Sequence, residues 1–199
     1  MNVYVESNFP LELARQQAEA PEVERILQLA DERRIQLIFP ASASTEPFST
    51  LMYYGNRRAR TLTEFTDVLA DLGRSRPYQT LVSNLEPFLA NLAVIKIEEV
   101  ERLEETIERM LRVGRSIPLT AQIFGYARWC KQNLGLSAQD AIMYASVLGD
   151  LAPATTDNCF VSRNSSDFGV LKASLEEAGC RYFAHFPRLL EFLNSQVGP

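Results

Sequence analysis

Short runs of β-branched and aromatic residues alternate with longer helical segments along this chain. The runs lie at residues 2–6, 34–39, 93–97, 158–162 and 181–184. Between them, apolar residues recur at the three- and four-residue intervals that mark one face of a helix. This alternation favours a parallel sheet covered by helices on both faces. We therefore expect a doubly wound α/β/α sandwich with a central, mostly parallel sheet of about four to five short strands.

The middle of the chain carries extra helical sequence. A hydroxyl-rich start and Pro47 predict a helix from about residue 46, which Gly73 would end. Further helical periodicity covers residues 76–92 and 98–115. We expect residues 1–199 to form a single domain with a helical insertion or extension at about 73–116.

The charge and the cysteine content limit the partners, the metal sites and the cellular location that we expect. The formal net charge is −5, so a polyanion would have to be held by a local patch rather than by the whole surface. Cys130, Cys159 and Cys180 lack the spacing of metal ligands, and Cys159 and Cys180 are expected to be buried thiols. The first residues resemble neither a secretory signal nor a membrane span, and the expected location is cytoplasmic, with no membrane partner.

Acidic residues fall where an α/β sheet usually binds ligands. Glu6 ends the first strand, Glu46 begins the helix after the second, and Asp140 lies in the first turn of a later helix. Asn164 and Asp167 follow the strand at 158–162. Such positions meet outside the carboxyl ends of the strands. Clustered carboxylates repel one another unless a cation offsets their charge, so this pattern predicts a site for Mg²⁺ or Mn²⁺.

Each acid also has a purely structural interpretation. Ser137 and Asp140 match a capping box at a helix start. Glu46 could complement the helix dipole, and Asp167 could stabilise a turn. Because all of these acids lie where the carboxyl ends of the strands are expected to meet, their combination favours the functional interpretation.

A basic and aromatic cluster could contact a polyanion. Arg57 and Arg58 follow Tyr53 and Tyr54 by one turn, which suits a phosphate backbone and a stacked base. A solvated helix face is the alternative explanation. The single histidine, His185, argues against a histidine-dependent triad, and the absence of a glycine-rich phosphate loop argues against a Rossmann or P-loop nucleotide site.

These residues resemble the PIN-domain family, which are metal-dependent ribonucleases with a small doubly wound fold. Val3-Tyr-Val-Glu-Ser-Asn-Phe is similar to the family's opening strand, and Gln139-Asp-Ala-Ile-Met-Tyr-Ala to its third acidic motif. Phe160-Val-Ser-Arg-Asn-Ser-Ser-Asp-Phe is similar to its strand-to-loop motif. Glu46 takes the position of the acid after the second strand. Two departures are Glu6 in place of the usual Asp, and Asn164 where a fourth Asp is expected.

The resemblance implies a Mg²⁺- or Mn²⁺-dependent endoribonuclease, with RNA as substrate, a possible homodimer and a possible small antitoxin partner. Its implied catalytic residues are Glu6, Glu46, Asp140 and Asp167. Its implied metal ligands are these four and Asn164. Its implied substrate contacts are Asn8, Arg57, Arg58, Ser162 and Arg163.

Two other functions fit the same sequence. One is a catalytically weak PIN-like module that binds RNA or a protein partner, which Asn164 and the acidic overall charge favour. The other is a phosphohydrolase that acts on a small nucleotide.

Overall fold

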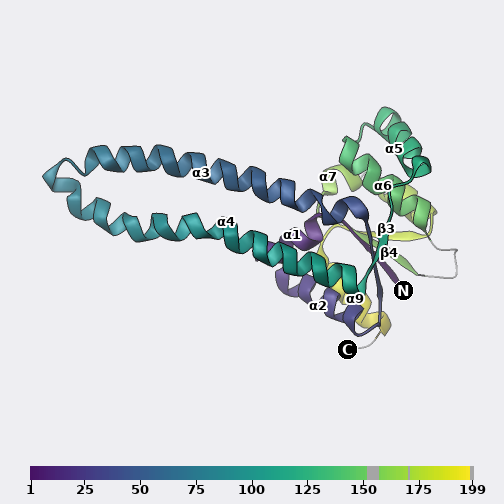
Figure 1. The fold of residues 1–199 in the computed structure, drawn as a ribbon. Helices are drawn as coiled ribbons and strands as arrows, with labels where there is room; N and C mark the ends of the chain where they lie inside the picture. The colour runs from purple at the N-terminus through teal and green to yellow at the C-terminus, as the bar shows by residue number, and fades with distance from the viewer. Residues whose placement is uncertain (152–156, 170, 198–199) are drawn as a thin grey trace.

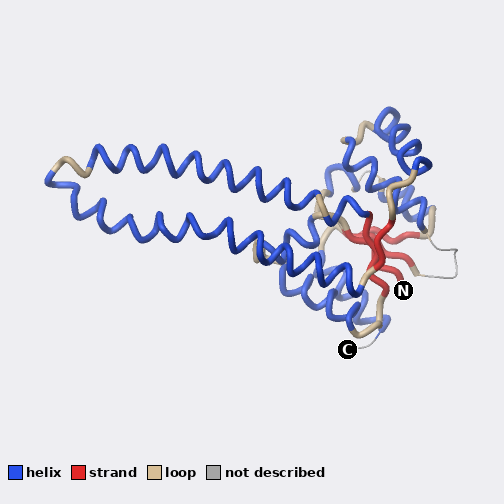
Figure 2. The backbone as a smooth tube through the Cα atoms, in the orientation of Figure 1, coloured by secondary structure: helices blue, strands red, loops and turns tan. Residues whose placement is uncertain are grey.

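A central parallel sheet organises the chain. The computed structural model describes residues 1–151, 157–169 and 171–197. Within these ranges five strands form one sheet in the order β3-β2-β1-β4-β5 (Figures 1 and 2). Their bounds are β1 Asn2–Val5, β2 Gln36–Pro40, β3 Arg115–Ile117, β4 Asn158–Val161 and β5 Cys180–Phe183. All four strand pairings are parallel, which confirms the expected α/β class.

The central strand, β1, is buried on both faces. Val3, Tyr4 and Val5 are fully buried, as expected where helices cover both sides of a parallel sheet. Tyr4 pairs with Ile38 of β2 on one side and with Phe160 of β4 on the other. The carboxyl ends of β1 and β4 therefore lie side by side.

Helices cover both faces of this sheet. The end of α4, with α2 and α9, lies on one side, and α5 and α6 lie on the other (Figure 1). Within the described ranges, every helix is too short or too polar to cross a membrane. The bounds are α1 Asn8–Ala14, α2 Ala20–Asp31, α3 Glu46–Leu72, α4 Gln79–Val113, α5 Ala121–Leu134, α6 Ala138–Asp150, α7 Ser165–Phe168, α8 Lys172–Glu177 and α9 Phe186–Val197.

The two longest helices form an arm that projects away from the sheet (Figures 1 and 2). With 27 and 35 residues, α3 and α4 are about 40 Å and 52 Å long. A short 3₁₀ turn, Arg76–Tyr78, joins them at the tip. Leu62 and Leu69 of α3 face Leu85 and Leu92 of α4 along the seam by helical periodicity, and all four are buried or half-buried.

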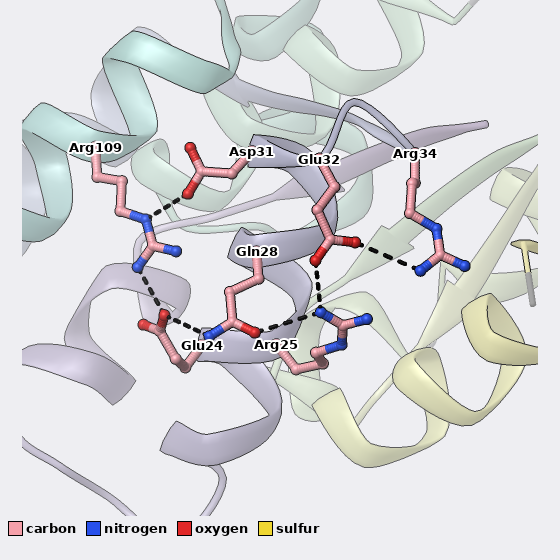
Figure 3. A network of polar contacts seen from close by, with 7 residues as sticks. All are labelled: Glu24, Arg25, Gln28, Asp31, Glu32, Arg34 and Arg109. Carbon is pink, nitrogen blue, oxygen red and sulfur yellow. Dashed lines mark hydrogen bonds and ion pairs between the residues drawn. The ribbon is translucent and has the colours of Figure 1, made fainter. Parts of the chain in front are cut away.

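The base of α4 anchors the arm to the sheet domain. Leu103 and Met110 are fully buried in the core. On the polar side, the Arg109 guanidinium donates to Glu24 at 2.7 Å and to Asp31 at 2.8 Å, both on α2 (Figure 3). Glu24 also accepts a hydrogen bond from Gln28, which fixes its carboxylate beside Arg109.

The expected third strand at 93–97 is wrong. These residues lie inside α4, because the flanking sequence continues the apolar seam of a helix over its whole length. The third strand is instead Arg115–Ile117, in place of the end of an expected helix. Gly114 makes the tight junction, since a Cβ there would lie 2.9 Å from the Phe39 ring and from the Met110 carbonyl oxygen.

Three helical segments also differ from expectation. Pro10 and the apolar residues up to Ala30 predict one helix that begins at the proline. The structure has two helices there, α1 and α2, and α1 begins at Asn8, two residues before the proline. The sequence pattern also predicts a single helix at 167–177. The structure has two short helices in this region, α7 and α8, and residue 170 lies outside the described residues. The added helical sequence begins at Glu46, well before the expected position 73, because α3 runs unbroken from the sheet edge to the tip.

The burial of α4 predicts where the arm's stability comes from. Leu103→Ala removes a fully buried side chain and should lower the free energy of unfolding by about 2–5 kcal/mol. Leu111→Ala, on the same helix but 55% exposed, should change it by no more than about 0.5 kcal/mol. Urea denaturation of both variants measures the difference, and equal losses would show that Leu103 is not part of the core.

Candidate acidic site at the carboxyl edge of the sheet

Glu6 is a buried carboxyl group at the end of the central strand. Its side chain accepts hydrogen bonds from the Ser7 hydroxyl at 3.0 Å, the Asn8 amide at 2.5 Å and the Ser162 hydroxyl at 3.0 Å. The Asn8 backbone N–H also donates to it, at 3.3 Å. Burial raises the pKa of Glu6, while these donors act in the opposite direction.

The loop after β4 is connected to Glu6 through Ser162. The Ser162 hydroxyl donates to Glu6 and accepts from the Asn164 backbone N–H at 3.0 Å. Its carbonyl oxygen accepts from the Tyr182 hydroxyl at 3.1 Å. Ser162 is fully buried, so its hydroxyl has a fixed position between the two strand ends. The sequence-predicted residues Glu6, Asn8, Ser162 and Asn164 therefore lie in one connected group.

Asp140 lies in the first turn of α6, which Ser137 caps, and it contacts the same loop. The Ser137 hydroxyl accepts from the Asp140 backbone N–H at 3.1 Å and donates to the Asp140 carboxylate, so the capping interpretation holds. The Asn164 side-chain amide donates to Asp140 at 3.2 Å and to Asp167 at 2.6 Å. Asn164 thus bridges the two acids with a neutral donor.

Glu46 faces the other acids across the edge of the sheet. It is the first residue of α3, and it is half-buried. Burial raises the pKa of the Glu46 carboxyl group, and the negative charges of Glu6 and Asp140 raise it further, whereas the Ser7 hydroxyl lowers it. Glu6 and Asp140 are therefore close enough to Glu46 to repel its ionised carboxylate.

The chemistry of this donor set fits a hard divalent cation. Carboxylate and amide oxygens are the ligands that Mg²⁺ and Mn²⁺ prefer, and the repulsion felt by Glu46 is the kind that a cation relieves. In the described residues, no group of three or more His, Cys, Asp or Glu side chains converges closely enough to hold a metal as positioned. Binding would require these side chains to turn towards a common point.

Two of the three predicted basic contacts are engaged inside the protein. Arg58 forms a two-point ion pair with Glu99, which is 5% exposed. Arg163 donates to Glu12 at 3.1 Å, and Glu12 is 1% exposed. Both arginines neutralise buried carboxylates, whereas Arg57 is exposed on α3.

Sequence reasoning missed the part that Ser7 plays. Its hydroxyl is one of the donors to Glu6 and also acts on Glu46. The signal was present, because Ser7 directly follows the acid that ends a buried strand.

No known family model, curated protein or solved structure matches this chain. Function therefore has to be inferred from the chain's own residues and contacts. The strand order and the group of acids at the carboxyl edge of the sheet are the two features that bear on it most directly.

The electrostatics at Glu46 predict a stabilising substitution. In metal-free buffer at neutral pH, Glu46→Gln should raise the melting temperature by no more than about 2 °C, because solvent screens part of the repulsion at a half-buried carboxylate. The pKa of Glu46 is raised in the folded state, so its ionised form opposes folding above that pKa. The gain should disappear as the pH falls and Glu46 takes up a proton.

A matched charge change serves as the control for this measurement. Glu104→Gln alters the net charge equally at an exposed position of α4 and should leave the melting temperature unchanged. Calorimetry across the pH range compares both variants with the wild type. A loss of stability in Glu46→Gln at neutral pH would contradict the repulsion.

Proposed function

We propose that this protein is a PIN-like, divalent-metal-dependent endoribonuclease that hydrolyses RNA phosphodiester bonds. The observation that carries the proposal is the position of Glu46 at the carboxyl edge of a parallel sheet, where the negative charges of Glu6 and Asp140 act on it. Natural proteins seldom retain such repulsion without a function for it. A metal-assisted phosphodiesterase needs carboxylates in this arrangement.

The proposed mechanism divides the work among the acids. Glu6, Glu46 and Asp140 would hold Mg²⁺ or Mn²⁺, with Asp167 and the Asn164 carbonyl oxygen completing the set. When bound, the ion supplies charge neutralisation at the phosphoryl oxygens and activates water for attack at phosphorus. Ser7, Asn8 and Ser162 orient Glu6 through hydrogen bonds. Burial and the charges of Glu6 and Asp140 raise the pKa of Glu46, and a bound cation would act in the opposite direction.

The base of the arm offers a contact surface for an RNA strand. A cavity of about 370 Å³ there is lined by Arg15, Tyr54 and Arg57 among others. The Arg15 guanidinium lies over the Tyr54 ring, 4.8 Å from its centroid. Arg57 could contact a backbone phosphate, and the aromatic and guanidinium planes could stack a base. This surface is on the helix that begins at Glu46, which suits a substrate extending away from the acids.

The nuclease proposal predicts loss of activity on removal of one ligand. Wild-type protein should cleave a mixed pool of single-stranded RNA with Mn²⁺ and stop in EDTA. Asp140→Asn should lower the cleavage rate by about 10² or more, because it removes a charge that the ion requires. Gel analysis of cleavage products and calorimetry with Mn²⁺ give the two readouts.

Asp71→Asn makes the same chemical change far from the acids. Asp71 lies near the tip of the arm, 3.7 Å from Arg74 in an exposed ion pair that contributes little to stability. The Asp71→Asn variant should cleave RNA at the wild-type rate. If no Mn²⁺ binding depends on Asp140, the enzyme proposal is wrong. A nucleotide phosphohydrolase would instead cleave small nucleotides and leave RNA intact.

A second candidate is a catalytically weak module that binds RNA or a protein partner. Asn164 favours it, because its amide already bridges Asp140 and Asp167 without a cation. The internal ion pairs of Arg58 and Arg163 also leave less positive charge available for RNA.

Asn164→Asp distinguishes the two candidates. In a metal site the added carboxylate should strengthen Mn²⁺ binding by about tenfold. Without metal it should destabilise the protein, because two donated hydrogen bonds are replaced by repulsion from Asp140 and Asp167. Calorimetric titration and thermal melts with and without Mn²⁺ measure both effects. Destabilisation that Mn²⁺ does not reverse would favour the weak module.

A further inference from the structure

The connection between β4 and α7 is short, and each of its side chains contacts a different part of the molecule. It consists of Ser162, Arg163 and Asn164. The Ser162 hydroxyl donates to Glu6 at the end of β1. The Arg163 guanidinium donates to Glu12 of α1 at 3.1 Å. The Asn164 amide donates to one carboxylate of α6 and one of α7. Three consecutive side chains therefore fix one short segment of backbone.

The contact made by Arg163 differs from the other two because it lies outside the acidic site. The carboxylates that its neighbours contact are those of the proposed cation site, namely Glu6, Asp140 and Asp167. To bind an ion, these acids have to turn, and Asn164 has to present its carbonyl oxygen, because an amide N–H group cannot ligate a cation. The hydrogen bonds of Asn164 therefore change when an ion binds. The ion pair of Arg163 with Glu12 involves none of these groups and can persist.

Glu12 is a fixed acceptor for Arg163. It is 1% exposed, and both of its carboxylate oxygens are engaged. Oε2 accepts from Arg163, and Oε1 accepts from the Glu19 backbone N–H at 2.8 Å. The Glu19 carboxylate lies 3.9 Å from the Arg163 Nε atom and accepts from the Phe186 backbone N–H at 3.0 Å. Arg163 thus faces two carboxylates that other parts of the fold hold in place.

Helix α1 connects this ion pair to the acidic site. Asn8, which donates to Glu6, lies four residues before Glu12 in α1. The two side chains therefore share one face of the helix, about 6 Å apart along its axis. The loop after β4 contacts this side of the molecule at two points, through Ser162 and through Arg163. Two separated contacts fix the direction of the loop as well as its position, which a single hydrogen bond does not.

We propose that Arg163 is a positioning residue, whose ion pair with Glu12 holds the backbone of the loop while Asn164 and the acids turn towards a cation. This inference rests on the proposed metal-dependent function. It gives Arg163 a role inside the protein, in place of the contact with RNA that the family resemblance implies. A buried ion pair of this kind can select one conformation without adding stability.

The first experiment measures how firmly the loop is held in the metal-free full chain. Arg163→Met should speed hydrogen exchange of the Asn164 backbone amide at least tenfold, as measured by NMR. That N–H donates to the Ser162 hydroxyl at 3.0 Å, a contact that depends on the position of the loop. Arg163→Lys keeps a cation beside Glu12 and should retain most of the protection.

Arg109→Met is the matched control. It breaks the two ion pairs between α4 and α2, away from the acids (Figure 3), and should leave the exchange of the Asn164 amide unchanged. Equal exchange rates in Arg163→Met and Arg109→Met would overturn the proposal.

A double variant separates positioning from charge neutralisation. Glu12→Gln combined with Arg163→Met removes both charges, so that no carboxylate is left buried without its partner. If Arg163 only neutralised Glu12, the double variant would regain the wild-type exchange rate at Asn164. Positioning predicts that exchange stays fast, because the contact that held the loop is still missing. Circular dichroism checks that each variant is folded.

Steady-state kinetics separate positioning from contact with RNA. Arg163→Met should raise the Mn²⁺ dissociation constant about tenfold. It should lower kcat for RNA cleavage by about 10², because a displacement of about 1 Å in a site is enough for such a loss. KM for RNA should not change, since the side chain does not touch the substrate. A raised KM with unchanged kcat would overturn the proposal in favour of a contact between Arg163 and RNA.

The two proposals can fail separately. A wild type that binds no Mn²⁺ would contradict the nuclease function, and the exchange rates would still decide whether Arg163 holds the loop. A wild type that binds Mn²⁺ no more tightly than Arg163→Met would overturn the positioning role alone.

Discussion

The buried carboxyl group of Glu6 constrains everything built around the edge of the sheet. An ionisable group at the end of a fully covered strand is costly unless donors surround it. Ser7 and Asn8, which follow it, and Ser162, which follows the neighbouring strand, provide those donors. The need to satisfy one carboxyl group therefore holds the ends of β1 and β4 in register and sets where Asn164 can reach.

The sheet was predictable to the extent that its strands are buried. Runs such as Val3–Val5 and Cys159–Val161 are continuous, apolar and buried, and they were located correctly from the sequence. The third strand, Arg115–Ile117, was missed because it has three residues and two are exposed, so it carries almost no strand pattern. Residues 93–97 were wrongly predicted as a strand, because their β-branched residues give a segment of a long helix the composition of a strand.

The acidic site was predictable from position, but its internal contacts were not. Glu6, Glu46 and Asp140 could be grouped because they follow or precede elements that end at one edge of a parallel sheet. The roles of Arg58 and Arg163 could not be foreseen, because their partners, Glu99 and Glu12, are 41 and 151 residues away in sequence. Only the fold reveals that these arginines neutralise buried acids.

The continuity of α3 has a mechanical consequence. Its first residue is Glu46, at the edge of the sheet, and it runs without interruption to the tip. The arm is therefore a rigid element about 40 Å long that carries a carboxylate where it joins the sheet. Where α4 returns to the sheet, also at the base of the arm, Gly114 makes a tight junction between α4 and β3. A small tilt of the arm would therefore move Glu46 relative to Glu6 and Asp140. A molecule that binds the arm and tilts it would change the distances between these carboxylates.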